Sequence, residues 1–272
     1  MIFAIVKGLK LVLRKALGIF KLDLIRKRER NFDQIIKQCF VIIQATPQIV
    51  VDVGAHNGSS IDRFNRLFQS PDIYAFEPNP DLANSLTSRH GGAKIRVFRM
   101  ALGSKQGNLQ FNVHTTSTGS SSFLDFDSTQ KFATRRGLSG QTVEKIITEV
   151  TTLDHVFDLE KLRGQDIDYL KIDTQGTELE VLRGGANLLK NQLIKFIELE
   201  VITAPVYLNK EKWSSVIDYL LRFNYHLVAL SNDGRFFNLG PFDIIRNPEL
   251  QFDCIFTNNN IYKKLLETSA ND

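Results

Sequence analysis

The chain has 272 residues, of which 43% are hydrophobic, and carries a formal net charge of +4 and two cysteines. This length suits one domain with a sizeable core and a small addition, and two distant cysteines exclude a disulfide scaffold and favour free thiols in a reducing compartment. Residues 1–30 hold nine basic and two acidic residues, whereas the rest holds 25 and 28. The basic character therefore belongs to the N-terminal arm, and a nucleic-acid-binding function is disfavoured.

The N-terminal arm, residues 1–45, begins with a basic amphipathic pattern in which apolar residues recur at helical spacing from Ile2 to Phe20. Charges are too frequent for a transmembrane helix, which needs about 20 largely apolar residues, and no secretory cleavage site follows. Two interpretations stay open. Residues 1–30 contact an anionic membrane peripherally, on the cytoplasmic side, or they pack against the domain or a second subunit. Residues 31–45 indicate a second helix, which ends before Pro47.

The main domain, residues 46–260, opens with the stretch QIVVDVGAHNG from Gln48 to Gly58. A short β-branched run ends at a glycine-rich turn, and a segment with helical periodicity follows to Phe68. Glycine suits this turn because it adopts positive φ freely and leaves no Cβ between the backbone and a ligand. The pattern predicts a buried strand, a tight turn and a helix N-terminus, which is the opening unit of a nucleotide-binding α/β domain.

The second predicted strand, Ile73 to Phe76, delivers Glu77 at 23 positions after Gly54. A carboxylate at that offset can accept the hydroxyls of an adenosine ribose. A dinucleotide fingerprint would require glycine where this chain has His56 and Ser59, and no P-loop pattern follows. These differences disfavour an NAD-dependent oxidoreductase and favour an adenosine ligand without a pyrophosphate, of which S-adenosylmethionine is the common one.

The middle of the chain is less regular. We expect a helix from Pro80 to Arg89, a third strand from Ile95 to Leu102 and a half-exposed strand from Leu109 to His114. Residues 115–142 are rich in serine and also carry aromatic residues and arginines. Because a loop this long in a compact domain is usually functional or disordered, a lid over the active site and a plain linker both stay open.

The fourth predicted strand, Ile167 to Asp173, places Tyr169, Lys171 and Asp173 on one face by its period of two. Asp173 ends this strand, at the edge where doubly wound sheets hold ligands. We expect Lys171 to be a structural partner of Asp173 or of Glu198.

The remaining elements are a helix that opens at Gly176, a fifth strand from Leu193 to Ile202, a helix over 212–223, and strands over 225–230 and 251–257. Alternation in the fifth strand directs Glu198 and Glu200 to one face, where two like charges repel unless solvent, a cation or a substrate hydroxyl separates them. The polar tail, residues 261–272, is expected to fray.

Seven motifs in this order resemble those of the FkbM family of S-adenosylmethionine-dependent methyltransferases: VDVGAHNG, AFEPNP, RMALGS, the serine turn at 119–122, TTLDHV, DYLKIDTQGTELEVLRGG and IELE. They extend from about Val50 to Phe256. The first motif departs from the family, which usually has Asn where this chain has His56. The resemblance implies a Rossmann-like class I methyltransferase fold, with a mostly parallel, doubly wound sheet of seven strands and an antiparallel strand near the C-terminus.

The resemblance also implies an S-adenosylmethionine cofactor and O-methylation of a hydroxyl on a sugar, glycolipid or natural-product acceptor. Together with the turn and strand-end positions, it gives the expected cofactor contacts as Asp52, Gly54, Ala55, His56, Gly58, Ser59, Glu77, Pro78, Met100, Ala101, Ser121 and Asp173. For Met100 and Ala101 a plain core role has comparable weight. His56 is expected to be a hydrogen-bonded turn residue rather than a catalytic one.

The candidate catalytic residues are Asp173 and Glu200. Methyl transfer needs an aligned hydroxyl that is relieved of its proton, so Asp173 either binds or deprotonates the acceptor with help from Glu200, or binds the ammonium group of the cofactor. Carboxylates of this strand region are hard ligands, but their spacing matches no metal motif and no metal is expected. The alternative function is a membrane-associated binding protein on the same fold, without turnover.

Overall fold

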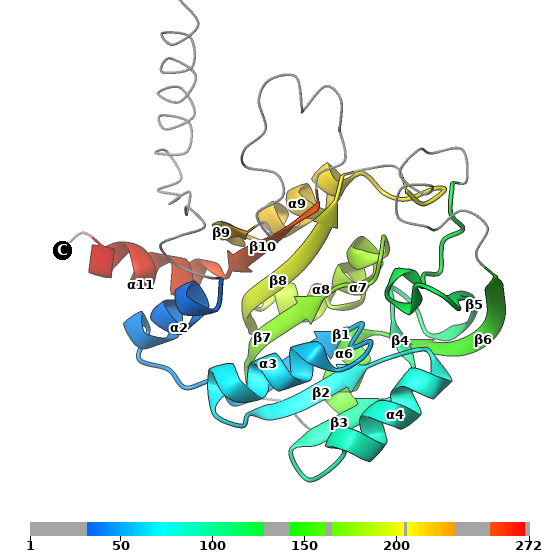
Figure 1. Cartoon of the computed structure of the whole chain (residues 1–272). Helices are drawn as coiled ribbons and strands as arrows, with labels where there is room; N and C mark the ends of the chain where they lie inside the picture. Colours follow the sequence, from blue (N-terminus) through cyan, green and yellow to red (C-terminus); the bar gives the residue numbers. More distant parts are fainter. Residues whose placement is uncertain (1–31, 128–141, 161–164, 204–205, 232–250, 270–272) are drawn as a thin grey trace, which may run out of the picture.

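The computed structural model describes residues 32–127, 142–160, 165–203, 206–231 and 251–269 (Figure 1). The predicted amphipathic helix of residues 1–30 and most of the predicted lid, residues 128–141, lie outside the described residues. Within the described part, no helix is both long and apolar enough to cross a bilayer.

The main sheet has seven strands, β1 (Ile49–Val53), β2 (Asp72–Phe76), β3 (Ile95–Phe98), β7 (Ile167–Ile172), β8 (Ile194–Ile202), β9 (His226–Ser231) and β10 (Gln251–Thr257). Their order is β3-β2-β1-β7-β8-β10-β9. The first five are parallel, and β10 runs antiparallel to both of its neighbours. This is the predicted doubly wound sheet with an antiparallel strand near the C-terminus. The chain reverses its winding direction between β1 and β7, and doubly wound folds bind ligands at such a switch point.

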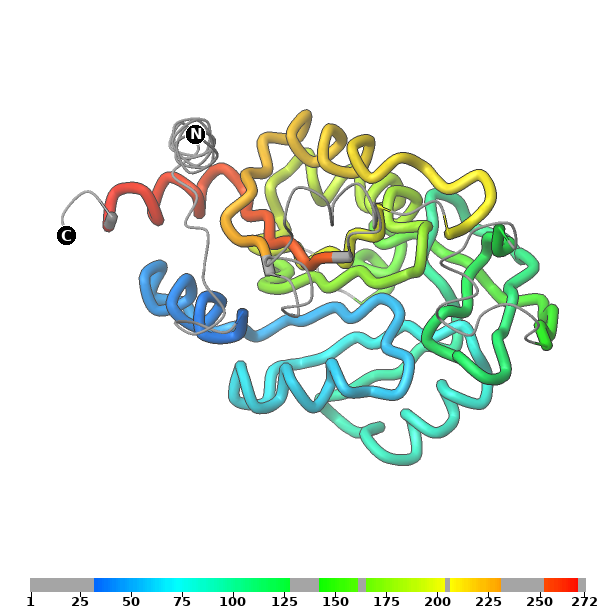
Figure 2. The backbone as a smooth tube through the Cα atoms, turned by 45° about the horizontal axis from the view of Figure 1, so that its top comes forward, coloured from blue at the N-terminus to red at the C-terminus, as the bar shows by residue number. Residues whose placement is uncertain are grey.

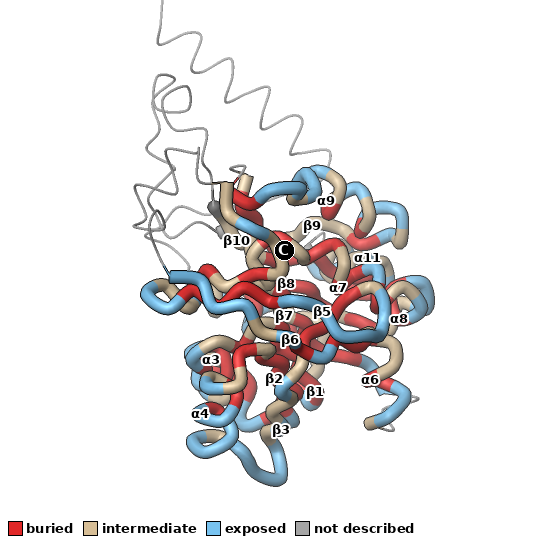
Figure 3. Tube along the Cα trace, turned by 90° about the vertical axis from the view of Figure 1, so that its right-hand side faces the viewer, coloured by how far each residue is buried: buried red, intermediate tan, exposed pale blue. Residues whose placement is uncertain are grey.

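Helices cover both faces of the sheet: α2 (Phe32–Ile42), α3 (Ser59–Phe68), α4 (Pro80–His90) and α11 (Asn259–Ser269) contribute to one layer, and α6 (Leu153–Leu159), α7 (Glu178–Gly184), α8 (Ala186–Lys190) and α9 (Trp213–Arg222) to the other. Every residue of β1 is buried, as expected of a central parallel strand. The buried part of the chain follows the central strands, with exposed segments on the outer helices (Figure 3). Two apolar clusters, one on each face, therefore hold the sheet rigid beneath the site.

A second, three-stranded sheet was not predicted. It has the order β4-β6-β5, from β4 (Ala101–Leu102), β5 (Gly107–His114) and β6 (Val143–Thr151). The single third strand expected over 95–102 is thus divided, because Ala101 and Leu102 pair with β6 instead of continuing alongside β2. A short 3-10 helix, η1 (Thr118–Ser120), follows β5. The second sheet carries the serine turn to the carboxyl edge of the main sheet.

The C-terminal segment also differs from the expectation, because residues 259–269 form helix α11 instead of a frayed tail. Ile261 is buried, and Leu265 packs against the same apolar cluster, so an i, i+4 pair anchors the helix. Helix α11 lies beside α2, as both views of the backbone show (Figures 1 and 2). The first described helix and the last one thus close the same face of the sheet.

Candidate active site

The predicted glycine turn places the carboxyl ends of β1 and β7 in close contact. Gly54 has a φ of 84°, and a Cβ built on it would lie 2.0 Å from the carbonyl oxygen of Asp173. The amide of Asp173 donates to the carbonyl of Val53 at 3.0 Å, and the amide of Gly54 donates to Phe76 at 3.0 Å. Any side chain at position 54 would separate the two strands. The turn is therefore specified by close backbone approach as well as by its positive φ.

Glu77 lies at the end of β2, facing this turn. Its Oε2 accepts a hydrogen bond from the amide of His56 at 2.8 Å, and its Oε1 accepts one from the amide of Asn79 at 2.9 Å. Burial raises the pKa of Glu77 to about 7, although both backbone donors act in the opposite direction. Each carboxylate oxygen retains a second lone pair. The group is thus fixed in place, with acceptor capacity left for a pair of hydroxyls.

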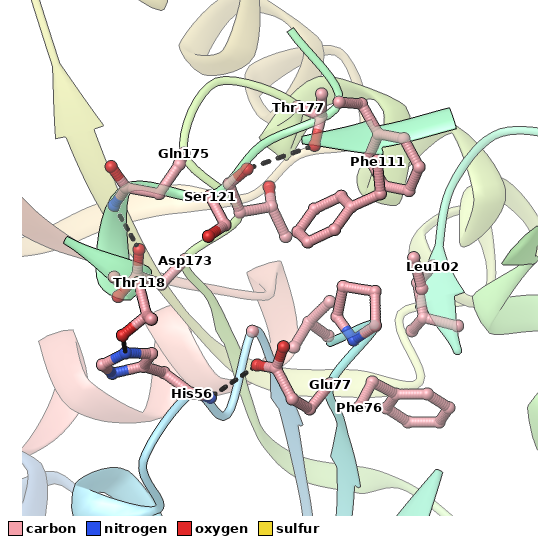
Figure 4. A pocket seen from close by; sticks show the side chains of 17 residues that line it. His56, Phe76, Glu77, Leu102, Phe111, Thr118, Ser121, Asp173, Gln175 and Thr177 are labelled. Atoms are coloured by element: carbon pink, nitrogen blue, oxygen red, sulfur yellow. Dashed lines mark hydrogen bonds between the residues drawn. The ribbon is translucent and has the colours of Figure 1, made fainter. Parts of the chain in front are cut away.

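His56 adopts a left-handed conformation with a φ of 48°. Its Nε2 lies 2.8 Å from Oγ1 of Thr118 in η1, so the glycine turn and the serine turn are joined by a side-chain hydrogen bond (Figure 4). Burial lowers the pKa of His56, and Lys171 adds to this effect while Asp173 opposes it. A neutral, hydrogen-bonded imidazole follows, consistent with the role of a turn residue that the sequence favours.

An open cavity with an empty volume of about 520 Å³ lies over these strand ends. Its apolar wall comes from the ends of β1 and β2, from β4 and β5 of the second sheet, and from the segment after the serine turn: Val53, Phe76, Pro78, Ala101, Leu102, Phe111 and Phe123. Its polar end is formed by the turns after β1, β2 and β7 and by the serine turn: Gly54, His56, Glu77, Thr118, Gly119, Ser121, Asp173, Thr174, Gln175 and Thr177. An apolar cleft with a few convergent polar groups is the usual form of a small-molecule site.

Asp173 and Glu200 come together at the polar end of this cavity. Lys171 Nζ lies 3.2 Å from Oδ2 of Asp173 and 3.9 Å from Oδ1 of Asp52. Burial acts to raise the pKa of Asp173, but the Lys171 ammonium and the hydrogen bonds from Gln175 and Glu200 together hold that pKa below its usual value. Burial and the charge of Asp173 hold the pKa of Glu200 well above its usual value. The pair therefore combines an ionised Asp173 with a protonated Glu200.

The partners of Lys171 include the predicted Asp173 and also Asp52. Glu198 has different partners, because Arg63 donates to it at 2.7 Å and the hydroxyl of Tyr169 also donates to it. The two glutamates that alternation places on one face of β8 thus have separate surroundings. Glu198 belongs to a buried structural network with helix α3, whereas Glu200 lies near the cavity.

Seven of the predicted site residues line the cavity: Gly54, His56, Glu77, Pro78, Ala101, Ser121 and Asp173. The others do not. Asp52 is fully buried beneath the turn, where it accepts from the hydroxyl of Ser60, and Ala55 belongs to the core. Gly58 faces helix α4, because a Cβ built on it would meet the side chain of Leu86. The side chain of Ser59 is exposed. Met100 packs against the apolar cluster on the face of the sheet that α6, α7, α8 and α9 cover. Glu200 does not line the cavity, but it lies beside two residues that do, since it shares a hydrogen bond with Asp173 and accepts one from Gln175.

Among the cavity-lining positions that the sequence did not single out as site residues are Phe111, Thr118 and Gln175. Phe111 lies on the strand predicted as half-exposed, and its inward orientation depends on the unpredicted second sheet. Gln175 lies inside the motif DTQG, and its left-handed φ of 55° beside Gly176 makes it part of a tight turn. The glycine that follows an acid at a strand end was the available signal.

The main sheet has a doubly wound strand order, a glycine turn follows β1 and contacts the end of β7, and a buried carboxylate follows β2. Together these features define an adenosine-binding protein of the Rossmann-like, class I methyltransferase type. A comparison with protein families agrees, because residues 52–227 match the methyltransferase FkbM domain. The chain belongs to that family and is an S-adenosylmethionine-dependent methyltransferase.

Among curated proteins, the chain is similar to the 2-O-methyltransferase NoeI of Sinorhizobium fredii, with 24% identity over 80% of this chain and 88% of that protein. Among solved structures, it resembles the methyltransferase FkbM of Methylobacillus flagellatus, with 13% identity, a TM-score of 0.45, and coverage of 78% of this chain and 44% of that one. The chain thus spans less than half the length of that crystallised protein. It also resembles the magnesium protoporphyrin IX methyltransferase of Synechocystis, with 10% identity, a TM-score of 0.40, and coverage of 86% and 87%.

Proposed function

We propose that the protein transfers a methyl group from S-adenosylmethionine to a hydroxyl oxygen of a sugar, glycolipid or natural-product acceptor. The observation that carries this proposal is the juxtaposition of Asp173, Glu200 and Gln175 at the polar end of a cavity that Glu77 also lines. Carboxylates and amides are suited to binding hydroxyl groups. The 2-O position in the name of the NoeI relative supports oxygen as the methylated atom.

The residues of the cavity fit the cofactor. Glu77 has free acceptor capacity for the two ribose hydroxyls, and the apolar wall with Pro78, Leu102 and Phe111 suits the adenine ring. Gly54 lines the cavity, and its missing Cβ lets the backbone of Asp173 approach the turn beside it. When bound, S-adenosylmethionine would supply an electrophilic methyl group that a positioned hydroxyl oxygen can attack in line, with the thioether sulfur as the leaving group.

Asp173 has two candidate roles in this scheme. As the base, its carboxylate accepts the proton of the acceptor hydroxyl while the new O–CH₃ bond forms and the S–CH₃ bond breaks. As a cofactor ligand, it pairs with the ammonium of the methionine part. The neighbouring Lys171 keeps Asp173 ionised, which suits both roles, and the protonated Glu200 can donate a hydrogen bond to a second acceptor oxygen.

The Asp173→Asn variant separates the two roles. If Asp173 is the base, turnover falls by about 10²- to 10⁴-fold while S-adenosylmethionine affinity, measured by calorimetry, stays unchanged. If it binds the ammonium, affinity falls with turnover. Transfer of a labelled methyl group to a panel of glycans, glycolipids and hydroxylated natural products tests the function itself, with Glu144→Gln on the exposed part of β6 as a control. Cofactor binding without methylation of any hydroxyl acceptor would contradict the proposal.

Residues 1–30 are proposed to hold the protein at the cytoplasmic face of an anionic membrane, which would bring the site close to a lipid-linked acceptor. The support is the basic amphipathic pattern of that segment. Co-sedimentation with vesicles that contain about 30% anionic lipid compares the full chain with a form that starts at residue 31. Equal pelleting of the two forms would contradict the membrane role and favour packing against protein.

A further inference from the structure

Gln175 is in contact with three functional side chains that come from three separate segments. Its Nε2 lies 2.9 Å from Oδ1 of Asp173 and 2.6 Å from Oε2 of Glu200. Its Oε1 lies 3.1 Å from the hydroxyl of Tyr207. The side chain reaches across the polar end of the cavity toward Asp173 (Figure 4). A primary amide has two N–H donors, so each carboxyl group of the pair can receive one of them.

The orientation of this amide is set from both ends. Tyr207 lies near two acceptors, since its hydroxyl is 3.1 Å from the carbonyl oxygen of Ser120 and 3.1 Å from Oε1 of Gln175. Because a tyrosine hydroxyl can both donate and accept, this contact by itself fits either orientation of the amide. A flipped amide would turn its oxygen toward Asp173, whose charge would repel it. The charge of Asp173 therefore directs the amide nitrogen of Gln175 toward the two carboxyl groups, and Tyr207 holds the oxygen end of the amide.

The backbone of Gln175 is held in the same turn. It has a φ of 55°, and its carbonyl accepts from the hydroxyl of Ser122 at 2.9 Å. Ser120 and Ser122 belong to the serine turn, which His56 also contacts through Thr118. The glycine turn after β1 is therefore linked, through the serine turn, to the Gln175 residue that lies between Asp173 and Glu200.

We propose that Gln175, held at its amide oxygen by Tyr207, is a positioning residue that fixes the separation and direction of Asp173 and Glu200 relative to the acceptor hydroxyl. This inference rests on the proposed function, because it assigns the geometry of the same acid pair. Without the amide, the two buried carboxyl groups would lose a shared donor that sets their separation. Charged and titratable groups surround the pair on several elements: Asp52 on β1, His56 in the glycine turn, Glu77 after β2, Lys171 on β7, Glu178 on α7, Lys210, and Asp253 on β10.

The test compares Gln175→Ala, Gln175→Asn and Tyr207→Phe with the matched control Gln106→Ala, which removes an exposed glutamine from the turn before β5. A misplacement of about 1 Å can reduce turnover roughly 100-fold, so Gln175→Ala is expected to lower kcat by about 10- to 100-fold with cofactor affinity within threefold of wild type. The hydrogen bond from Gln175 lowers the pKa of Asp173. Its loss should therefore move the acid limb of the pH–rate profile to higher pH.

Tyr207→Phe should give a smaller loss of kcat, and it should add nothing in the Gln175→Ala background, because the hydroxyl acts through the amide. Gln175→Asn, which keeps an amide and tolerates a positive φ, should recover part of the lost rate. Additive effects of the two substitutions, or wild-type kcat in Gln175→Ala, would overturn the inference. If Gln175→Ala does not fold, the Tyr207→Phe and Gln175→Asn results decide by the same criteria.

A measurement that needs no turnover separates this inference from the proposed function. Carbon-13 NMR of carboxyl-labelled aspartate, with Asp173→Asn for assignment, follows the titration of Asp173 in wild type and in Tyr207→Phe. A shift to higher pH in the variant supports the positioning role even if no hydroxyl acceptor is methylated, which would refute only the proposed function. An unchanged titration, together with active wild-type protein, would refute the positioning role alone.

Discussion

Replacing Glu77 with glutamine tests the cofactor site at its most specific contact. The carboxylate is held by the amides of His56 and Asn79, one on each oxygen. A glutamine side chain would turn an NH₂ group toward one of these donors and leave that buried N–H without an acceptor. It would also offer the ribose at most one neutral acceptor in place of two charged ones.

The expected magnitude follows from these contacts. A hydrogen bond to a charged group contributes about 1.5–3 kcal/mol, and a neutral one about 1 kcal/mol. Exchanging two of the first kind for one of the second costs roughly 2–5 kcal/mol of binding free energy. At 1.4 kcal/mol per tenfold, the Kd for S-adenosylmethionine should rise by about 30- to 4,000-fold. Calorimetry at pH 8 measures this, with Glu144→Gln on β6 as the matched control.

The pH dependence gives a second signature of the same contact. Because the folded protein holds the pKa of Glu77 at about 7, above the usual value for a glutamate, the cofactor-binding carboxylate is present above pH 7 and is lost as the pH falls below it. Cofactor affinity should therefore weaken by up to tenfold per pH unit below 7. That dependence should be absent in Glu77→Gln. A Kd within threefold of wild type at pH 8 would refute the assignment of Glu77 to the ribose.

Three further substitutions test how the fold supports the site. In Gly54→Ala the new Cβ would lie 2.0 Å from the carbonyl oxygen of Asp173, so this variant should lose at least about 2 kcal/mol of unfolding free energy and all cofactor binding. Thermal melts and calorimetry measure the two effects, and the control Gly92→Ala should show neither. Arg63→Met leaves the buried Glu198 without its cationic partner and should cost about 3–5 kcal/mol in urea denaturation, against little for the exposed Arg66→Met. Ile261→Ala should cost about 2–4 kcal/mol if α11 is part of the core, and a loss no larger than that of Lys263→Ala would contradict this packing.

The elements with strong local signals could be predicted from the sequence. The run from Ile49 to Val53 and its glycine turn specify β1 and the start of α3, and the order of strands and helices led to the sheet that the structure contains. Strand β6 could not be found in this way. Its charged residues lie on an exposed ribbon, and its pairing with β4 and β5 depends on residues far apart in the chain. Helix α11 could have been found, since Ile261 and Leu265 give it one apolar side.

The site shows why residue types can be read from a sequence while their states cannot. Alternation along β7 and β8 places Lys171, Asp173, Glu198 and Glu200 on one face, but it assigns no charge to any of them. The difference between the two glutamates comes from groups that only the fold supplies, namely Arg63 of α3 beside Glu198 and the amide of Gln175 beside Glu200. Burial makes each charge costly unless it is paired. Asp173 therefore keeps its charge next to the Lys171 ammonium, while Glu200, buried beside the charge of Asp173, keeps its proton.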